Sequence, residues 1–185
     1  MRFLVLLTII LSVSSQARAG ILLDVGGVYL SDTLSASANS SSTKYSYNIG
    51  ALFNISKTLW GGWSYLGISH TETASGTTTS YASMDTGPTL KWQFGKSQNY
   101  SLSGTVNIIS RATYSSGSGS SEKWEGMSYW AAFGFMPEVS EGFHLGCSIN
   151  YFMASYTKKT VNNTESSASN SKSWIFPMLS LTKSW

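Results

Sequence analysis

The stretch YASMDTGPTLKWQF, residues 81–94, alternates apolar and polar side chains along almost its whole length. Successive side chains of a β-strand point to opposite faces, so this order gives a strand one apolar and one polar face. A helical period would mix both classes on every face. The apolar face carries Ala82, Met84, Pro88, Leu90, Trp92 and Phe94, and the polar face carries Ser83, Asp85, Gly87, Thr89, Lys91 and Gln93.

Two further stretches repeat this alternation. In 44–55 only Leu52 breaks it, and one face carries Tyr45, Tyr47, Ile49, Ala51, Phe53 and Ile55. In 100–114 only Ile109 breaks it; Leu102, Val106, Ile108 and Ala112 face one way, and Ser101, Ser103, Thr105, Asn107, Arg111 and Thr113 face the other. A strand between lipid and a polar interior needs this pattern over about 9–11 residues. The three stretches therefore predict strands that cross a membrane.

Polar connections of two lengths separate the expected strands. We predict eight strands, at 20–34, 44–55, 59–72, 81–94, 100–114, 123–136, 143–157 and 172–185. Long Ser/Thr/Asn/Gly-rich loops occupy 35–43, 73–80, 115–122 and 158–171, and short turns occupy 56–58, 95–99 and 137–142. Transmembrane barrels have short periplasmic turns and longer extracellular loops. An even number of strands places both termini on the periplasmic side.

The first 19 residues have the pattern of an export signal. Arg2 precedes an apolar run at 3–13, and Ala17-Arg18-Ala19 before Gly20 forms a small-x-small cleavage site. The run is much shorter than the roughly 20 residues that a membrane-spanning helix needs. We expect residues 1–19 to be a cleaved signal peptide and residues 20–185 to form one barrel domain.

Charge and cysteine content exclude several classes of function. Without Arg2 and Arg18 the chain keeps 10 Lys and Arg against 9 Asp and Glu, and these cations are scattered and form no stripe, so we expect no nucleic-acid partner. Cys147 is the one cysteine, which rules out an intramolecular disulfide. We expect no metal site and no cofactor.

Aromatic residues gather near the ends of the expected strands, where Trp and Tyr would meet lipid headgroups. A soluble β-sandwich, the alternative, would bury its aromatics in mid-strand. The periplasmic girdle is predicted to contain Phe53, Trp92, Phe94, Tyr100, Phe135, Phe143 and Trp185. The outer girdle is predicted to contain Tyr45, Tyr47, Tyr114 and Tyr151.

In these features the chain resembles the small eight-stranded outer-membrane barrels, such as outer-membrane protein X and the transmembrane domain of outer-membrane protein A. Its last strand is similar to the signal read by the barrel-assembly machinery, a final Trp185 preceded at every second position by Leu181, Leu179 and Ile175. Lys183 and Pro177 depart from that pattern; a lysine can lift its ammonium toward the interface, and a bulge would accommodate the proline.

The resemblance implies an all-β fold, an eight-stranded antiparallel up-and-down transmembrane β-barrel in the outer membrane. It also implies extracellular loops and periplasmic termini. The partners that it implies are outer-membrane lipid, lipopolysaccharide and the assembly machinery. It implies no particular activity.

Charged side chains on the polar faces should meet inside the barrel. Pairing the fourth and fifth strands about a turn near Ser97 puts Asp85 opposite Ile109 and diagonal to Arg111, which predicts an ion pair between Asp85 and Arg111. Such a pair is either a gate that admits ions or a fixed bridge, and the narrow interior of eight strands favours the bridge. Asp24 and Lys91 are expected to join the same polar core.

Apolar side chains are predicted to line the other half of the interior. They are Trp130, Met136, Phe152, Phe176 and Met178. A lumen of this kind could hold a fatty or aromatic molecule, or the side chains could simply pack against one another, and packing is the favoured interpretation.

The chain offers little for a catalytic site. His70 is predicted near the outer rim with Glu72 and numerous hydroxyls close by, which an acyltransferase could use, but hydroxyls are so abundant in these loops that their proximity carries almost no information. The barrel enzymes that deacylate lipid A carry a His-x-Ser pair, whereas the two histidines here begin His70-Thr71-Glu72 and His144-Leu145-Gly146. We therefore expect a non-catalytic protein that acts structurally, or through an extracellular partner at its loops. A narrow pore or carrier for a small polar or apolar solute is the first alternative, and a lipid-modifying enzyme is the second.

Overall fold

The computed structural model describes residues 20–34, 40–117, 119 and 121–185, so the predicted signal peptide lies outside the described residues. Antiparallel strands make up most of this part. They are β1 (Ile21–Leu34), β2 (Ser40–Ser56), β3 (Leu59–Ala74), β4 (Thr77–Phe94), β5 (Tyr100–Ser116), β6 (Glu122–Phe135), β7 (Glu138–Ser140), β8 (Phe143–Val161) and β9 (Thr164–Ser184), with a short 3-10 turn, η1 (Lys96–Gln98). The described residues contain no helix long and apolar enough to span a bilayer.

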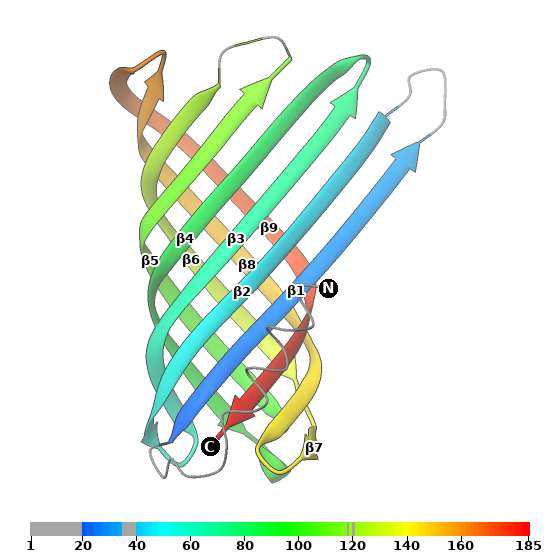
Figure 1. Ribbon diagram of the computed structural model, residues 1–185, viewed down its shortest axis with the longest axis vertical. Helices are drawn as coiled ribbons and strands as arrows, with labels where there is room; N and C mark the ends of the chain where they lie inside the picture. The colour runs from blue at the N-terminus through cyan, green and yellow to red at the C-terminus, as the bar shows by residue number, and fades with distance from the viewer. Residues whose placement is uncertain (1–19, 35–39, 118, 120) are drawn as a thin grey trace.

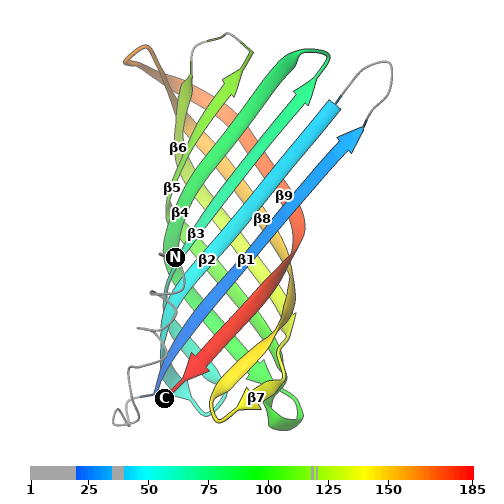
Figure 2. The same cartoon turned by 45° about the vertical axis from the view of Figure 1, so that its right-hand side comes forward.

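Eight of these strands close into a ring. Each pairs with the next, β6 pairs with β8, and β9 returns to β1, while β7 pairs only with β8 at one rim. The strands are steeply tilted, and β1 begins at the same end of the barrel at which β9 finishes (Figures 1 and 2). The predicted eight-stranded antiparallel up-and-down barrel is confirmed.

Side-chain alternation follows the predicted faces on β2, β4 and β6. On β4, Met84 and Leu90 are exposed on the outside, while Asp85, Thr89 and Lys91 are buried inside. Leu52, the exception noted on β2, packs inside the barrel against Leu22 and Trp60. The polar faces therefore line the interior.

A bulge on β5 reverses the predicted faces of its upper half. Ile108 and Ile109 are both exposed on the outside, and the pairing of β5 with β6 shifts register there. Beyond the bulge, Ser110 and Ala112 point inward and Arg111 points outward. The predictions that Ala112 faces lipid and Arg111 faces the lumen are wrong, because both assumed unbroken alternation through Ile109.

Two of the predicted loops, 73–80 and 158–171, are strand hairpins instead. Their turns are Ser75–Gly76, with φ of 51° and 78°, and Asn162–Asn163, with φ of 49° and 64°. Positive φ at both central residues is the geometry of a type I′ hairpin turn, for which asparagine and glycine are favoured. The barrel wall therefore rises well beyond the alternating part of the sequence at its upper end (Figure 1).

The seam between β1 and β9 is paired only near the termini. Its ladder runs from Leu22 opposite Ser184 to Gly27 opposite Leu179, after which the two strands diverge (Figures 1 and 2). Beside this seam the outward side chains Tyr29 and Leu179 are 67% and 73% exposed, whereas most other large apolar side chains are 60% exposed or less.

Pro177 lies on β9 just beyond the last pair with β1. It keeps its register opposite Ile149 on β8, so the bulge that its position suggested is absent, and the irregularity of this strand pair falls at Tyr156 instead. Proline donates no backbone hydrogen bond and is typical of strand edges. Its position therefore fits a strand that is paired on one side alone.

We predict uneven hydrogen exchange along β1. Every second amide between Val28 and Thr33 points away from β2 and has no ladder partner on β9, so it should exchange much faster than the amides of β4, which pair on both sides. Solution NMR of the refolded barrel in micelles measures these rates. Equal protection of all β1 amides would show that the seam is closed.

Candidate functional site

A buried ion pair crosses the lower interior. Lys91 Nζ lies 2.9 Å from Asp24 Oδ1 and donates to the Thr182 hydroxyl at 3.2 Å, while that hydroxyl donates to Asp24 at 3.0 Å. The structure thus brings together two of the residues expected in the polar core. The cavity beside the pair measures about 10 Å³, which leaves room for about one water molecule.

Asp85 is fully buried higher in the barrel, and Arg111 does not reach it. Its carboxylate accepts hydrogen bonds from the hydroxyls of Ser83 at 2.8 Å, Ser128 at 2.7 Å, and Ser110. The predicted ion pair is wrong, because the β5 bulge puts Ser110 opposite Asp85. Arg111 lies on the outer surface, where its Nε is 3.6 Å from Glu125 Oε1. The gate built on that pair is excluded with it.

Apolar packing fills the interior above and beside Asp85. Four of the predicted lumen residues pack in one cluster and are at most 4% exposed: Trp130, Phe152, Phe176 and Met178. The hydroxyls of Tyr81 and Tyr156 meet across the barrel at 2.6 Å. We call this cluster, with Leu66, Ile68, Ala112, Ala132 and Ala154, the apolar plug.

Met136 and Tyr114 are not where the sequence suggested. Met136 is buried inside but belongs to the lower polar layer, with its Sδ 4.0 Å from Lys91 Nζ. Tyr114, predicted for the outer girdle, packs inside against the plug and stacks on Trp124 with ring centroids 4.8 Å apart. The β5 bulge is again the reason, because Tyr114 lies beyond it.

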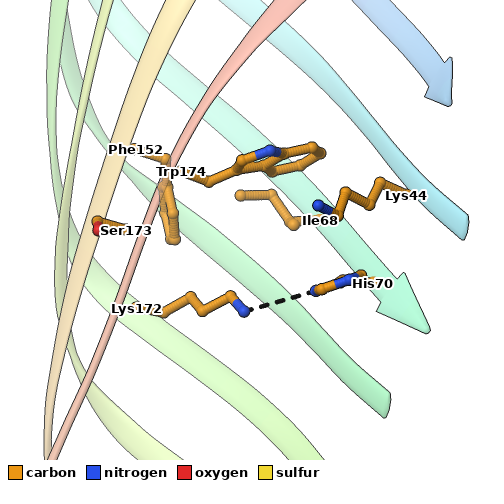
Figure 3. A pocket seen from close by; sticks show the side chains of 7 residues that line it. All are labelled: Lys44, Ile68, His70, Phe152, Lys172, Ser173 and Trp174. Atoms are coloured by element: carbon orange, nitrogen blue, oxygen red, sulfur yellow. Dashed lines mark hydrogen bonds between the residues drawn. The ribbon is translucent and has the colours of Figure 1, made fainter. Parts of the chain in front are cut away.

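A pocket lies against the plug residues Ile68 and Phe152, and Figure 3 shows the side chains that line it. It is lined by Lys44, Ile68, His70, Phe152, Lys172, Ser173 and Trp174 and measures about 100 Å³. A neighbouring cavity of about 300 Å³ shares His70 and Lys172 and adds Glu72, Tyr81, Tyr114 and Trp124 to the lining. We call the two together the mouth pocket.

Two lysines give the mouth pocket a positive character. Lys172 Nζ lies 3.5 Å from His70 Nδ1 and 5.4 Å from the ring centroid of Tyr81, and Lys44 Nζ lies 5.9 Å from the ring of Trp174. Neither lysine has a carboxylate within 4.0 Å among the described residues. The pocket therefore combines unpaired cations with aromatic walls.

The sequence did not single out the mouth pocket. In the sequence Lys44 is only one of several polar residues on the polar face of 44–55. Lys172 directly follows the predicted loop 158–171, so the sequence did not show whether its side chain points into the barrel. His70 was predicted near a rim, and it lies toward the rim opposite the termini, with Ser42 Oγ at 3.3 Å and Glu72 Oε2 at 3.8 Å from Nε2. Because strand pairing across the ring brings these residues together, no local motif could have revealed them.

The second histidine lies at the opposite end. His144 is buried, and its Nδ1 is 3.1 Å from the backbone oxygen of Met136. No group of three or more His, Cys, Asp or Glu in the described part of the chain could hold a metal ion.

The outer surface carries most of the predicted girdle residues. Near the lower rim, Phe94 stacks on Trp92 and Tyr100, with ring centroids 4.6 and 5.8 Å apart, and Tyr100 contacts Phe135 at 5.3 Å. Phe53 is exposed at this rim, and Phe143 and Trp185 are half-buried. Toward the other rim the exposed aromatic residues include Tyr45, Tyr47 and Tyr151.

No protein-family model matches the chain, and no curated protein sequence matches it. Among solved structures it is similar to Neisserial surface protein A, at a TM-score of 0.49 and 17% identity over 89% of this chain and 94% of that one. It is also similar to outer membrane protein AlkL in DMPC lipid bilayers, at 0.47 and 10% over 93% and 92%. A third match is the translocator domain of the autotransporter NalP from Neisseria meningitidis, at 0.46 and 12% over 99% and 67%. Similarity at this level does not indicate a function, so the function has to be inferred from the residues of this chain.

Proposed function

We propose that this chain is an integral protein of the bacterial outer membrane, a closed barrel that works as a surface scaffold. In this proposal the long hairpins are extracellular and meet a partner there, and both termini are periplasmic. The wall contacts outer-membrane lipid and lipopolysaccharide. The role is non-catalytic.

The apolar outer surface is the observation that carries the proposal. Large apolar side chains on all eight ring strands are exposed, among them Tyr29, Ile49, Trp63, Leu90, Val106, Phe133, Ile149 and Leu179. A soluble monomer rarely exposes a contiguous apolar patch of more than a few hundred Å². An apolar band with a filled interior is instead what hydrocarbon around a small barrel requires.

The positions of polar groups on the outer surface also support placing this apolar band in a membrane. On the described ring strands, the outward charged side chains lie toward the rims, with Lys183 at the lower end and Arg111 and Glu125 at the upper end. Thr86 is a polar outward residue within the band, and its hydroxyl donates to the Ser64 carbonyl at 2.9 Å and accepts from Trp63 Nε1 at 2.5 Å. The hydroxyl of Thr86 therefore has both an acceptor and a donor partner and does not face lipid with an unsatisfied hydrogen bond.

The last strand supports a role for the assembly machinery as a partner. Leu179 faces outward, Leu181 is half-buried, and the backbone N–H of Trp185 donates to the Ile21 carbonyl at 3.0 Å. Lys183 donates to the Glu141 carbonyl at 2.8 Å, and its ammonium lies 5.9 Å from the ring centroid of Trp185. The apolar Leu179 on this strand therefore stays accessible from outside, while the charge of Lys183 is held at the rim.

The hairpins offer the surface for an extracellular partner. Within the β8–β9 hairpin Lys158 pairs with Glu165 at 3.0 Å, and Lys159 ties the hairpin to Glu122 of β6 at 3.6 Å. The upper part of β1 adds a strand edge that has no ladder partner on β9, and such an edge can accept a strand from another chain. The filled interior disfavours the alternative of a narrow pore.

Bilayer conductance tests the scaffold against the pore. Inserted into planar bilayers, the mature barrel should give no steady channels, because the Asp24–Lys91 pair and the apolar plug close the lumen in series. A variant in which Trp130, Phe152, Phe176 and Lys91 are all replaced by alanine should produce leak currents. This variant is the positive control, because its currents show that the assay detects an opened barrel. Steady channels in the unmodified protein would overturn the scaffold proposal.

A further inference from the structure

We propose that the mouth pocket binds a small amphiphilic anion, a single carboxylate carried on an aromatic ring or a short alkyl chain. This binding site goes beyond the scaffold role and does not depend on it. It is argued from the charges of the pocket, its walls and its size.

The charge balance of the pocket favours one anion. Lys44 and Lys172 bring two positive charges, and Glu72 brings one negative charge. The Glu72 side chain is 56% exposed and lies against His70, without a lysine ammonium within 4.0 Å. One positive charge is therefore left over, and a bound carboxylate would supply the missing partner through charge-assisted hydrogen bonds.

The ammonium groups point into the pocket rather than out to solvent. In Figure 3 the Lys44 and Lys172 side chains extend toward the centre from opposite sides, with the Lys172 ammonium directed at His70. Both lie over aromatic rings, Lys44 over Trp174 and Lys172 over Tyr81. A contact with a ring face uses none of the ammonium N–H donors, and Lys172 directs only one of its three at His70, so donors remain for an incoming oxygen atom.

Apolar walls stand beside the cations. Phe152 is fully buried, Ile68 is 4% exposed, and Trp174 stacks on Phe176 with centroids 4.3 Å apart, so this wall is held rigidly by the plug beneath it. A ring or short chain would replace water there, whereas a purely polar anion would leave the wall without a matching surface. The walls therefore select an anion with an apolar body.

The size of the pocket limits that body. The larger cavity, of about 300 Å³, lies at the lower end of the range found for small-molecule sites, roughly 300–1,000 Å³, and the cavity of about 100 Å³ lies below it. They have room for one ring or a short chain with its carboxylate. A nucleotide or a polyphosphate would be too large, and an amine would be repelled by the lysines.

Calorimetry with a set of related probes tests the chemical class. The full mature barrel, refolded in a non-ionic detergent, is titrated with 4-phenylbutyrate, and titrations into empty micelles are subtracted. We expect 4-phenylbutan-1-ol, 4-phenylbutylamine and acetate to bind at least about tenfold more weakly, because each lacks the carboxylate or the apolar body. Octanoate replaces the ring by a chain, so comparison with 4-phenylbutyrate shows which apolar body the walls accept. Equal affinity for acid and alcohol would overturn the proposal.

Matched lysine variants locate the site. Lys172→Gln and Lys44→Gln should each weaken 4-phenylbutyrate about tenfold, and Trp174→Leu should weaken it while leaving acetate unchanged. Lys158→Gln is the control, since this lysine is exposed on the β8–β9 hairpin and pairs with Glu165 outside the pocket. Electrophoresis with and without heating confirms that each variant is folded.

The outcomes separate this site from the scaffold role. Equal loss of binding in Lys158→Gln and Lys172→Gln, or heat seen only with empty micelles, would remove the mouth pocket as a site. Either result would leave the silent conductance of the closed barrel untouched. Steady channels combined with normal 4-phenylbutyrate binding would overturn the scaffold alone.

Discussion

Replacing Lys91 with methionine is expected to lower the free energy of unfolding of the barrel by about 3–5 kcal/mol, because it leaves a buried charge without its partner. The side chain of Lys91 is 3% exposed and that of Asp24 is 12% exposed, and the cavity beside them has room for only about one water molecule, which cannot replace the charge of the lost ammonium. Thr182 alone would remain to donate a hydrogen bond to the Asp24 carboxylate. Urea titration of the refolded barrel in lipid vesicles, followed by tryptophan fluorescence, measures the change.

Two further variants show whether the loss comes from the unpaired charge. The double variant Asp24→Asn with Lys91→Met should recover much of the stability, since it removes both charges together. Lys158→Met removes the lysine of an exposed pair with Glu165 and should cost about 0–1 kcal/mol. If Lys91→Met cost no more than Lys158→Met, the lower ion pair would not be buried as described.

Replacing Val106 with arginine is expected to cost about 2–4 kcal/mol in lipid vesicles. Val106 faces outward from β5, midway between Tyr100 near the lower rim and Arg111 toward the upper rim. An arginine at this depth would place its guanidinium in hydrocarbon. The same urea titration reports the effect.

Thr113→Arg is the matched control on the same strand. Thr113 also faces outward, but it lies beyond Arg111, nearer the upper rim, so an arginine there should cost about 0–1 kcal/mol. In a soluble barrel both positions would face water, and the two variants would then have similar stabilities. Similar stabilities would therefore contradict the placement of the barrel in a membrane.

The alternating part of the sequence predicted the fold because lipid and a filled interior impose opposite demands on neighbouring residues. On β2, β4 and β6 most positions meet these demands, with Leu52 inside and Thr86 outside as exceptions, and the predicted faces match the structure. Above the outer rim both faces of a strand can meet water, so alternation ceases there. This explains why the β3–β4 and β8–β9 hairpins, 73–80 and 158–171, had the composition of loops.

One irregular position accounts for the main errors. The sequence showed Ile109 out of pattern, and a bulge at Ile108–Ile109 makes both isoleucines face outward. Every residue beyond it changes face, which moves Arg111 out of the lumen and Tyr114 into it. A single out-of-pattern residue can equally be an apolar side chain inside the barrel, as Leu52 is, so the sequence could not distinguish the two cases.

The polar residues of the candidate site were foreseen most directly where they lie on an alternating strand. Asp85 and Lys91 were expected inside because the two faces of 81–94 were clear, whereas Asp24 was expected to join them from a first strand whose register its glycines left open, and the structure places all three inside. The pairing of Asp24 with Lys91 depends on ring closure through β9, which no local pattern encodes. The same holds for the mouth pocket, where Lys44 and Lys172 come from strands far apart in the chain.

Site-directed spin labelling tests the central claim most directly, that hydrocarbon surrounds the wall and side chains fill the interior. In a Cys147→Ser background, nitroxides are attached one at a time to cysteines at Val106, Ile108, Ile109 and Ser110, and the barrel is reconstituted in vesicles. We predict that oxygen relaxes the first three labels strongly while a water-soluble nickel chelate does not, and that neither reagent reaches the label at Ser110. Strong relaxation by the nickel chelate at Val106 and Ile108 would contradict the account.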